Sequence, residues 1–341
     1  MRVKERRYVI LRDLVELYIK KGKPVSSREL VEEYGYPWCS ATVRNDLAAL
    51  EREGYIYKPF PSSGRIPTAK GFRFYANWIL KAAGLKGLDD EKALEGLEYL
   101  IAGYSAQGLW KAAASFIAFM VSQVGFLIPP DVEELKIVRA VLVRNGERDV
   151  TLHLFTEGGF SGEYSIELSR PVEEAELREA EEGLEELLKG RSLKEVEGGI
   201  RERLVVGGGR IGELVGEILG SLGSGRRRIY MAGLENLAEA IKRGRDAKAL
   251  LKFLGDERAF MELVLGSRPC GEGIQVRVGD LPAEGLEDFA LICSGFYRGL
   301  GVLGTFGPVW LDYARAIATV ELVARLLSHP EAVSAFRGQP Q

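Results

Sequence analysis

Hydrophobic residues near the amino terminus repeat at the spacing of an amphipathic helix. They stand at positions i, i+3, i+4 and i+7, as Leu11, Leu14, Val15 and Tyr18, and positions so spaced share one face of an α-helix. The stretch 20–24 that follows contains three lysines, a glycine and a proline. Because cations favour a helix carboxyl end, glycine caps it and proline prevents its continuation, the first helix is predicted to end there.

Two further helices are predicted beyond this point, joined by a short turn. Ser26 precedes the first of them and Glu29 stands three residues later. This is the spacing of a capping box, in which each side chain accepts a hydrogen bond from the other residue's backbone amide. Gly35 and Pro37 interrupt the helical pattern, and the next helix is expected over about 40–53, before Gly54.

Two short extended segments follow the third helix. Residues 55–57 and Ile66 flank a stretch, 59–65, that is rich in proline, serine and glycine, and such a stretch favours a tight turn. The resulting order is helix, helix, turn, helix, strand, loop, strand. That order is typical of a winged helix-turn-helix.

The remainder of the chain alternates between helical and strand-like patterns. Helices are predicted over 89–124, over the Glu-rich stretch 173–189, through most of 191–268 and over 312–327. Strands are predicted at 135–143, 150–155, 164–168, 274–278, 289–293 and 302–306. Strands on both sides of a helical stretch predict an α+β domain that carries an insertion.

Charge divides the chain into two unlike parts. The whole sequence has a formal net charge of -3. Residues 1–82, however, hold 16 Lys and Arg against 9 Asp and Glu, an excess of 7 positive charges, and the rest of the chain has an excess of 10 negative charges. A basic end joined to an acidic body indicates one part that meets an anion and another part with a different task.

Length and composition set further bounds. A chain of 341 residues with 46% hydrophobic content suggests two or three folded domains and argues against disorder. Three widely spaced cysteines and two histidines offer neither a disulfide framework nor a metal site, and they favour a reducing cytoplasm. No apolar run approaches the ~20 residues of a membrane helix. We therefore expect a cytoplasmic protein that has no metal and does not contact a membrane.

The third predicted helix has two chemically different faces. One face carries Val43, Leu47 and Leu50, and the opposite face carries Ala41, Arg44, Asn45 and Ala48. Arginine reads guanine bidentately, asparagine reads adenine, and alanine or the Thr42 methyl group can meet a thymine methyl. The pattern favours a helix that enters a major groove, and the alternative is an ordinary solvated face. Cys39, just before this helix, could be a redox switch, but no cluster of cations surrounds it in sequence, so a packed thiol is expected.

The predicted loop between the two short strands has a second set of candidate DNA contacts. Ser62, Ser63, Gly64 and Arg65 combine hydroxyl groups, a glycine turn and a fixed charge. Such a loop can grip phosphates, and an arginine there can enter a minor groove. Lys58, Lys70 and Arg73 flank the loop, which leaves an exposed hairpin with scattered cations as the alternative.

These blocks together resemble the HrcA family, the heat-inducible transcription repressors of bacteria. The resemblance rests on Ser-Ala-Thr-Val-Arg-Asn-Asp at 40–46 and on Ser-Gly-Arg-Ile-Pro-Thr followed by Lys-Gly at 63–71. Weaker similarity extends to 135–138, 232–237, 273–278 and 307–315. One departure lies at 58–62, where Lys-Pro-Phe-Pro-Ser replaces a Gln-Pro-His-Thr-Ser-like sequence of the family.

The resemblance implies an architecture and a set of partners. It implies a winged helix at 1–82, a GAF-like domain at 83–170 and 269–341, and an inserted, mainly helical dimerisation domain at 171–268. It also implies a homodimer that binds double-stranded DNA at an inverted-repeat operator, CIRCE, upstream of chaperone genes, with the GroE chaperonin as partner. The implied DNA-binding residues are Ser40, Thr42, Arg44, Asn45, Ser62, Gly64 and Arg65. We expect further DNA contacts from Ser26, Ser27, Lys58 and Lys70.

Other functional classes find less support. Residues 207–212 satisfy Gly-x-Gly-x-x-Gly after a short apolar stretch, and 228–231 could form a second strand of a dinucleotide-binding unit. The first strand would be very short, however, and no parallel array surrounds the motif. The carboxylates of 173–186 have the spacing of a solvated helix face. We therefore expect no enzyme and no cofactor, and the competing hypothesis is a regulator whose GAF-like domain binds a small effector.

Overall fold

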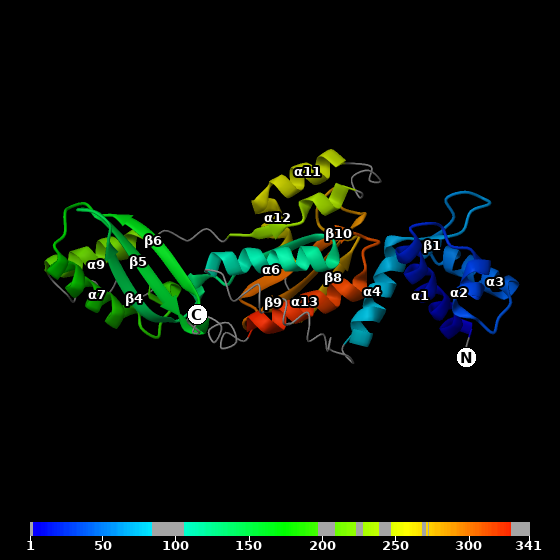
Figure 1. The fold of residues 1–341 in the computed structure, drawn as a ribbon, viewed down its shortest axis with the longest axis horizontal. Helices are drawn as coiled ribbons and strands as arrows, with labels where there is room; N and C mark the ends of the chain where they lie inside the picture. Colours follow the sequence, from blue (N-terminus) through cyan, green and yellow to red (C-terminus); the bar gives the residue numbers. More distant parts are fainter. Residues whose placement is uncertain are drawn as a thin grey trace, which may run out of the picture.

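A computed structural model describes the protein at residues 3–83, 106–196, 209–222, 228–238, 247–267, 271 and 273–328. It contains an N-terminal unit of helices with a small hairpin, a central unit around a five-stranded sheet, and a distal unit around a three-stranded sheet. The central unit lies between the other two, so the molecule is elongated (Figure 1). This combination of helices and sheets confirms the expected α+β class. Among the described residues, no helix is both long and apolar enough to cross a membrane.

The N-terminal unit has the expected order of elements. It consists of α1 (Val3–Lys21), α2 (Ser27–Tyr34), α3 (Ser40–Arg52), β1 (Ile56–Tyr57), β2 (Ile66–Pro67) and α4 (Ala69–Ala83). The predicted capping box of α2 is present, because Glu29 N donates to Ser26 Oγ at 3.2 Å and Ser26 N donates to Glu29 Oε2 at 2.8 Å. Gly35 ends α2 in the left-handed conformation with φ 60°, which glycine adopts without the steric penalty of a side chain.

The central unit is an antiparallel sheet in the strand order β7-β3-β10-β9-β8. Its strands are β3 (Val124–Ile128), β7 (Tyr230–Ala232), β8 (Ile274–Val278), β9 (Phe289–Phe296) and β10 (Gly301–Pro308). Helices α6 (Ala106–Val121) and α13 (Tyr313–Ser328) share one hydrophobic cluster with the sheet, and α11 (Ala247–Gly255) and α12 (Glu257–Gly266) share another. Helices therefore cover both faces (Figure 1), and β9 and β10 are buried throughout.

The distal unit has its own sheet and its own core. Strands β4 (Ile137–Arg144), β5 (Asp149–Thr156) and β6 (Ser161–Glu167) form an antiparallel sheet in that order. Helices α7 (Glu174–Leu188) and α9 (Arg210–Ser221) pack on one side of it, through a cluster that includes Leu152, Leu184 and Ile218. Single 3-10 turns lie at Val132–Glu134 and Glu157–Gly159, and a third, Leu234–Leu237, packs through Leu237 in the core of the central unit.

Two sequence expectations about this part of the chain differ from the structure. The sequence pattern places the three strands of 135–168 in the domain that contains 274–306, whereas they form a separate three-stranded sheet that packs on α7 and α9. Conversely, α11 and α12 fall within the insert expected at 171–268, yet Phe260 of α12 packs against Phe126 and Phe306 of the central sheet. Periodicity locates strands and helices but does not reveal which sheet they join.

A third difference concerns the helix expected over 89–124. The described helix α6 ends at Val121, and Val124 already begins strand β3. All five residues of this strand are buried. A short, continuously apolar strand therefore follows a helix directly, and periodicity alone does not separate two such elements. Residues 89–105 of the expected helix lie outside the described residues.

Helix α4 joins the N-terminal unit to the central unit. It packs on α13 and β8, with Tyr75 edge-on to Tyr313 at a ring distance of 6.2 Å. Arg73 also donates to Val278 O at 2.7 Å, at the end of β8. A single hydrophobic cluster runs from α1 through α4 to α13. The two units are therefore held in one fixed orientation by packing as well as by hydrogen bonds.

Candidate nucleic-acid interface

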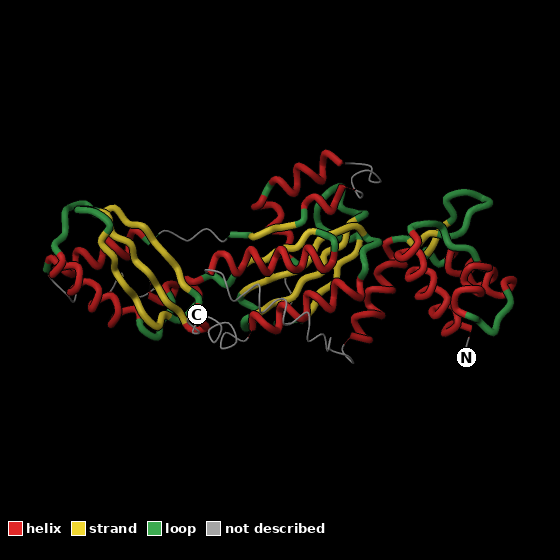
Figure 2. Tube along the Cα trace, viewed as in Figure 1, coloured by secondary structure: helices red, strands yellow, loops and turns green. Residues whose placement is uncertain are grey.

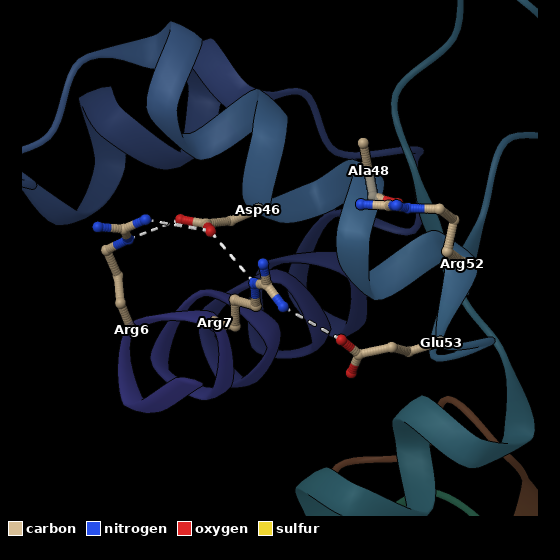
Figure 3. Close-up of polar contacts among 6 residues, drawn as sticks. All are labelled: Arg6, Arg7, Asp46, Ala48, Arg52 and Glu53. Carbon is tan, nitrogen blue, oxygen red and sulfur yellow. Dashed lines mark hydrogen bonds and ion pairs between the residues drawn. The ribbon is translucent and has the colours of Figure 1, made fainter. Parts of the chain in front are cut away.

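Helix α3 is held in place by a buried carboxylate. Asp46 is 3% exposed, and it accepts hydrogen bonds from Arg6 Nε at 2.6 Å and from Arg7 Nε at 3.4 Å. Arg7 Nη1 also donates to Glu53 Oε1 at 3.3 Å, so α1 is bonded to α3 near its middle and at its carboxyl end (Figure 3). The bond to Asp46 raises the pKa of Arg6 above its usual value. A buried carboxylate with charged partners on another helix fixes the orientation of α3.

The two predicted faces of α3 are confirmed. The side chains of Val43, Leu47 and Leu50 are completely buried, and Ala41, Arg44, Asn45 and Ala48 are exposed. Within the described part of the chain, neither Arg44 nor Asn45 has a side-chain hydrogen bond or ion pair. Both side chains are therefore available to an external partner, and the helix that carries them is rigidly mounted.

Hydroxyl groups at the start of α2 and α3 bond within the protein. Ser26 caps α2, and Ser27 is buried with its Oγ 2.9 Å from Ser40 Oγ. Cys39 occupies the N-cap position of α3, and its sulfur lies 3.4 Å from Thr42 Oγ1. The expectation of a packed thiol is wrong, because Cys39 is exposed. The contact with Thr42 lowers the pKa of Cys39 below its usual value.

The hairpin loop, residues 58–65 between β1 and β2, is closed by Ser63. Ser63 Oγ donates to Phe60 O at 2.7 Å and accepts from Phe60 N at 3.1 Å, and Ser63 N donates to Phe60 O at 3.0 Å. Lys58 and Ser62 are exposed, as DNA contact would require. A Cβ atom on Gly64 would lie 2.5 Å from the backbone carbon of Val25. Gly64 therefore allows the base of the loop to touch the segment that leads into α2.

Arg65 differs from its expected role. Its backbone exchanges hydrogen bonds of 2.7 and 2.9 Å with Val25, and the residue is only 8% exposed. Its guanidinium lies 3.8 Å from Glu51 of α3, and burial lowers the pKa of Arg65. The structure does not present this side chain to a minor groove, because the base of the loop folds back onto α3. Arg65 instead joins the loop to the helix.

Lys70 is also engaged inside the protein. Its ammonium group donates to Glu53 O at 2.8 Å and lies 4.3 Å from the centre of the Tyr55 ring. A cation at this place satisfies a carbonyl at the end of α3 and complements the helix dipole. Nearby, a Cβ atom on Gly71 would lie 2.3 Å from Tyr55 O. The Lys-Gly pair thus packs the start of α4 against the end of α3.

Sequence reasoning missed the clamp formed by Arg6, Arg7 and Asp46. A signal was present, because position 46 lies between Val43 and Leu47 on the core face of the helix. A carboxylate on a core face requires charged or hydrogen-bonding partners. The adjacent arginines of α1 were available for this purpose, but their distance in sequence concealed the pairing.

The Gly-x-Gly-x-x-Gly motif gains no support from its surroundings. Residues 207 and 208 and the preceding apolar stretch lie outside the described residues, and α9 begins at Arg210 after Gly209. Strand β7, the proposed second strand, pairs with β3 in antiparallel orientation. A dinucleotide-binding fold requires parallel strands joined by helices, whereas all pairings among the described strands of the sheets are antiparallel.

Comparison with known proteins gives a consistent result. A family model described as the HrcA protein C-terminal domain matches residues 107–317. A heat-inducible transcription repressor HrcA of Kocuria rhizophila is 30% identical over 331 residues, which cover 95% of this chain and 97% of that protein. Its counterpart from Thermotoga maritima is 32% identical over 308 residues, with 89% and 86% covered. The crystal structure of a hypothetical protein at 2.2 Å resolution has a TM-score of 0.63 and 28% identity, with 97% of this chain and 98% of that chain covered.

Proposed function

This chain belongs to the HrcA family, whose relatives are named heat-inducible transcription repressors, and we propose that it represses transcription by binding double-stranded DNA. The observation that carries the proposal is the exposed face of α3. Arg44 and Asn45 lie there without side-chain partners in the described structure, on a helix fixed by Asp46. These two residue types have the side chains best suited to guanine and adenine edges.

The N-terminal unit acts as a winged helix-turn-helix in this proposal. Helix α3 enters the major groove, with Ala41, Thr42 and Ala48 beside the reading residues. Lys58 and Ser62 of the hairpin loop contact phosphates, which adds affinity without base preference. The other candidate residues support DNA binding indirectly, by fixing the shape of the N-terminal unit, because their contacts in the free protein are internal. These residues are Ser26, Ser27, Ser40, Gly64, Arg65 and Lys70.

Two copies of the chain bind one operator. A two-fold dimer places two recognition helices in successive major grooves, so its operator is an inverted repeat. We assign the central unit to a GAF-like domain, and the distal unit, with its separate core, to dimerisation. The genes under control are those of chaperones, repression is relieved by heat, and the GroE chaperonin is the protein partner in the cytoplasm.

Footprinting tests the DNA-binding proposal directly. The full chain is added to a chaperone-gene promoter that carries an inverted repeat, first at low salt and then at rising salt. Protection of both half-sites is expected, with affinity that falls steeply as salt rises. Absence of protection at low salt would overturn the proposed function.

The dimer proposal has its own measurement. Analytical ultracentrifugation of the full chain is expected to give twice the monomer mass of 37.6 kDa. Removal of the distal unit would then be expected to yield a monomer that still binds a single half-site weakly. Dimerisation would be contradicted if the full chain were a monomer in solution and still protected both half-sites of the operator.

A further inference from the structure

Phe60, at the tip of the hairpin loop, is a large apolar side chain that is 70% exposed. The loop extends away from the helices of the N-terminal unit (Figure 2). A single exposed apolar residue is ordinary on a protein surface. Phe60 differs because the loop around it is built to hold it in place.

The tip of the loop is stiff. Three hydrogen bonds connect Phe60 with Ser63, at 2.7, 3.0 and 3.1 Å. Pro59 and Pro61 stand on either side of the phenylalanine, and each fixes its own backbone φ near -65°. A ring mounted on a preorganised loop loses little conformational freedom when it meets a partner.

The base of the loop is fixed beside the exposed face of α3. The guanidinium of Arg65 lies 3.8 Å from Glu51 of α3. Burial is the main cause of the lowered pKa of Arg65, and the positive charge of Arg44 lowers it further. Gly64 keeps the base of the loop in contact with Val25. A duplex that meets Arg44 therefore comes within reach of the loop as well.

The chemistry of the tip suits one part of a duplex. Residues 57–63 contain one cation, Lys58, and no acid, so the tip is attracted to phosphates. Phenylalanine and proline are residues that architectural proteins insert as apolar wedges into minor grooves. The buried position of Arg65 removes the cation that the sequence suggested for this groove.

On the basis of the proposed DNA binding, we propose that Phe60 is a minor-groove contact that packs its ring against the sugars and base edges beside the major groove occupied by α3. The contact adds affinity without releasing counterions, so it is independent of salt. It is strongest where the base step under the loop unstacks easily, as pyrimidine–purine steps do. Phe60 thereby influences operator preference.

The test compares two exposed phenylalanines of the full chain. Phe60→Ala removes the proposed contact, and Phe119→Ala removes a ring on α6 of the central unit that is 80% exposed. The probe is the duplex that the wild-type chain protects in the footprint. Phe60→Ala is expected to weaken binding about fivefold to tenfold, as the loss of one aromatic contact with a base does, with an unchanged slope against salt. Phe119→Ala is expected to bind like the wild type.

Hydroxyl-radical footprinting supplies the second measurement, because these radicals attack deoxyribose from the minor groove. Phe60→Ala is expected to expose minor-groove sugars beside each half-site and to leave the major-groove contacts protected. If Phe60→Ala binds and protects like the wild type, or if Phe119→Ala weakens binding equally, the minor-groove contact is refuted. Failure of the wild type to protect any duplex would instead refute the proposed function itself.

Discussion

The two sequence blocks of the N-terminal unit, residues 40–46 and 63–71, are both rich in residues that suit DNA, yet the structure uses them differently. In the first block, Arg44 and Asn45 project into solvent without side-chain partners in the described structure, and Asp46 turns inward to Arg6 and Arg7. In the second block, Arg65 and Lys70 both have partners inside the protein. The first block therefore provides a reading surface, and the second block provides the support that holds it.

The difference between the two blocks shows that a family-specific motif can serve internal packing and need not form the surface that contacts DNA. Gly64 and Gly71 lie where a Cβ atom would meet backbone at 2.5 and 2.3 Å. Thr68 Oγ1 donates to Gly54 O at 2.8 Å, between the end of α3 and the start of α4. Most of the second block thus packs β2 and α4 against α3. The exposed side chains of the hairpin loop are those of Lys58, Phe60, Pro61 and Ser62.

Among the proposed variants, loss of the clamp formed by Arg6, Arg7 and Asp46 is expected to have the largest effect on stability. Asp46→Ala leaves Arg6 and Arg7 without their shared partner, and removal of one member of a buried ion pair costs about 3–5 kcal/mol. Because both arginines are partly exposed, we expect a loss of about 2–3 kcal/mol in the free energy of unfolding, measured by urea denaturation. Glu53→Ala is the matched control and should lose less than about 1 kcal/mol, since the Glu53 pair lies at the surface. Equal losses in the two variants would contradict the clamp.

The reading surface should respond in binding and not in stability. Arg44→Ala removes an exposed side chain, so the midpoint of urea unfolding should stay near the wild-type value. Affinity for the protected operator should fall by about 1–3 kcal/mol, and preference among bases at one position of each half-site should relax. Fluorescence anisotropy with operator variants measures both quantities. A uniform loss across all sequences would assign Arg44 to phosphate and not to a base.

In the second block, a substitution at Gly64 should lower stability, whereas Arg44→Ala lowers DNA affinity. Gly64→Ala forces a Cβ atom against Val25, and such overpacking costs about 1–2 kcal/mol of stability. Gly220→Ala in helix α9 is the control, because a Cβ atom there meets nothing within 4 Å. It should be neutral or stabilising by up to about 1 kcal/mol. Thermal unfolding of both variants distinguishes a packing role for Gly64 from mere backbone freedom.

The smallest expected effects are those of Lys58→Ala and Lys70→Ala, which should differ in kind. Lys58→Ala should reduce the slope of log affinity against log salt by about 0.9, the value for one phosphate contact. Lys70→Ala should leave that slope unchanged and lower the free energy of unfolding by about 0.5 kcal/mol through loss of a cation at the α3 carboxyl end. The sequence alone predicted a phosphate contact for both. A reduced slope for Lys70→Ala would restore that prediction.

Prediction from sequence succeeded where the determinants are local. The capping box of Ser26 and Glu29, the left-handed Gly35 and the two faces of α3 all depend on residues within one or two turns of helix. The strand over 274–278 was predicted at its observed limits for the same reason. The strands near 137–167 were also located, but their sheet was not, because pairing joins segments that periodicity treats separately.

The amino-acid sequence by itself determined the helices of the N-terminal unit, which side of α3 faces the core, and the excess of positive charge over residues 1–82. These features follow from side-chain spacing and composition. Only the tertiary structure decided which cations remain free. Arg65 is buried against Val25 and Glu51, and Lys70 is bonded to Glu53. The availability of a side chain depends on segments distant in sequence, and their approach is set by packing of the whole unit.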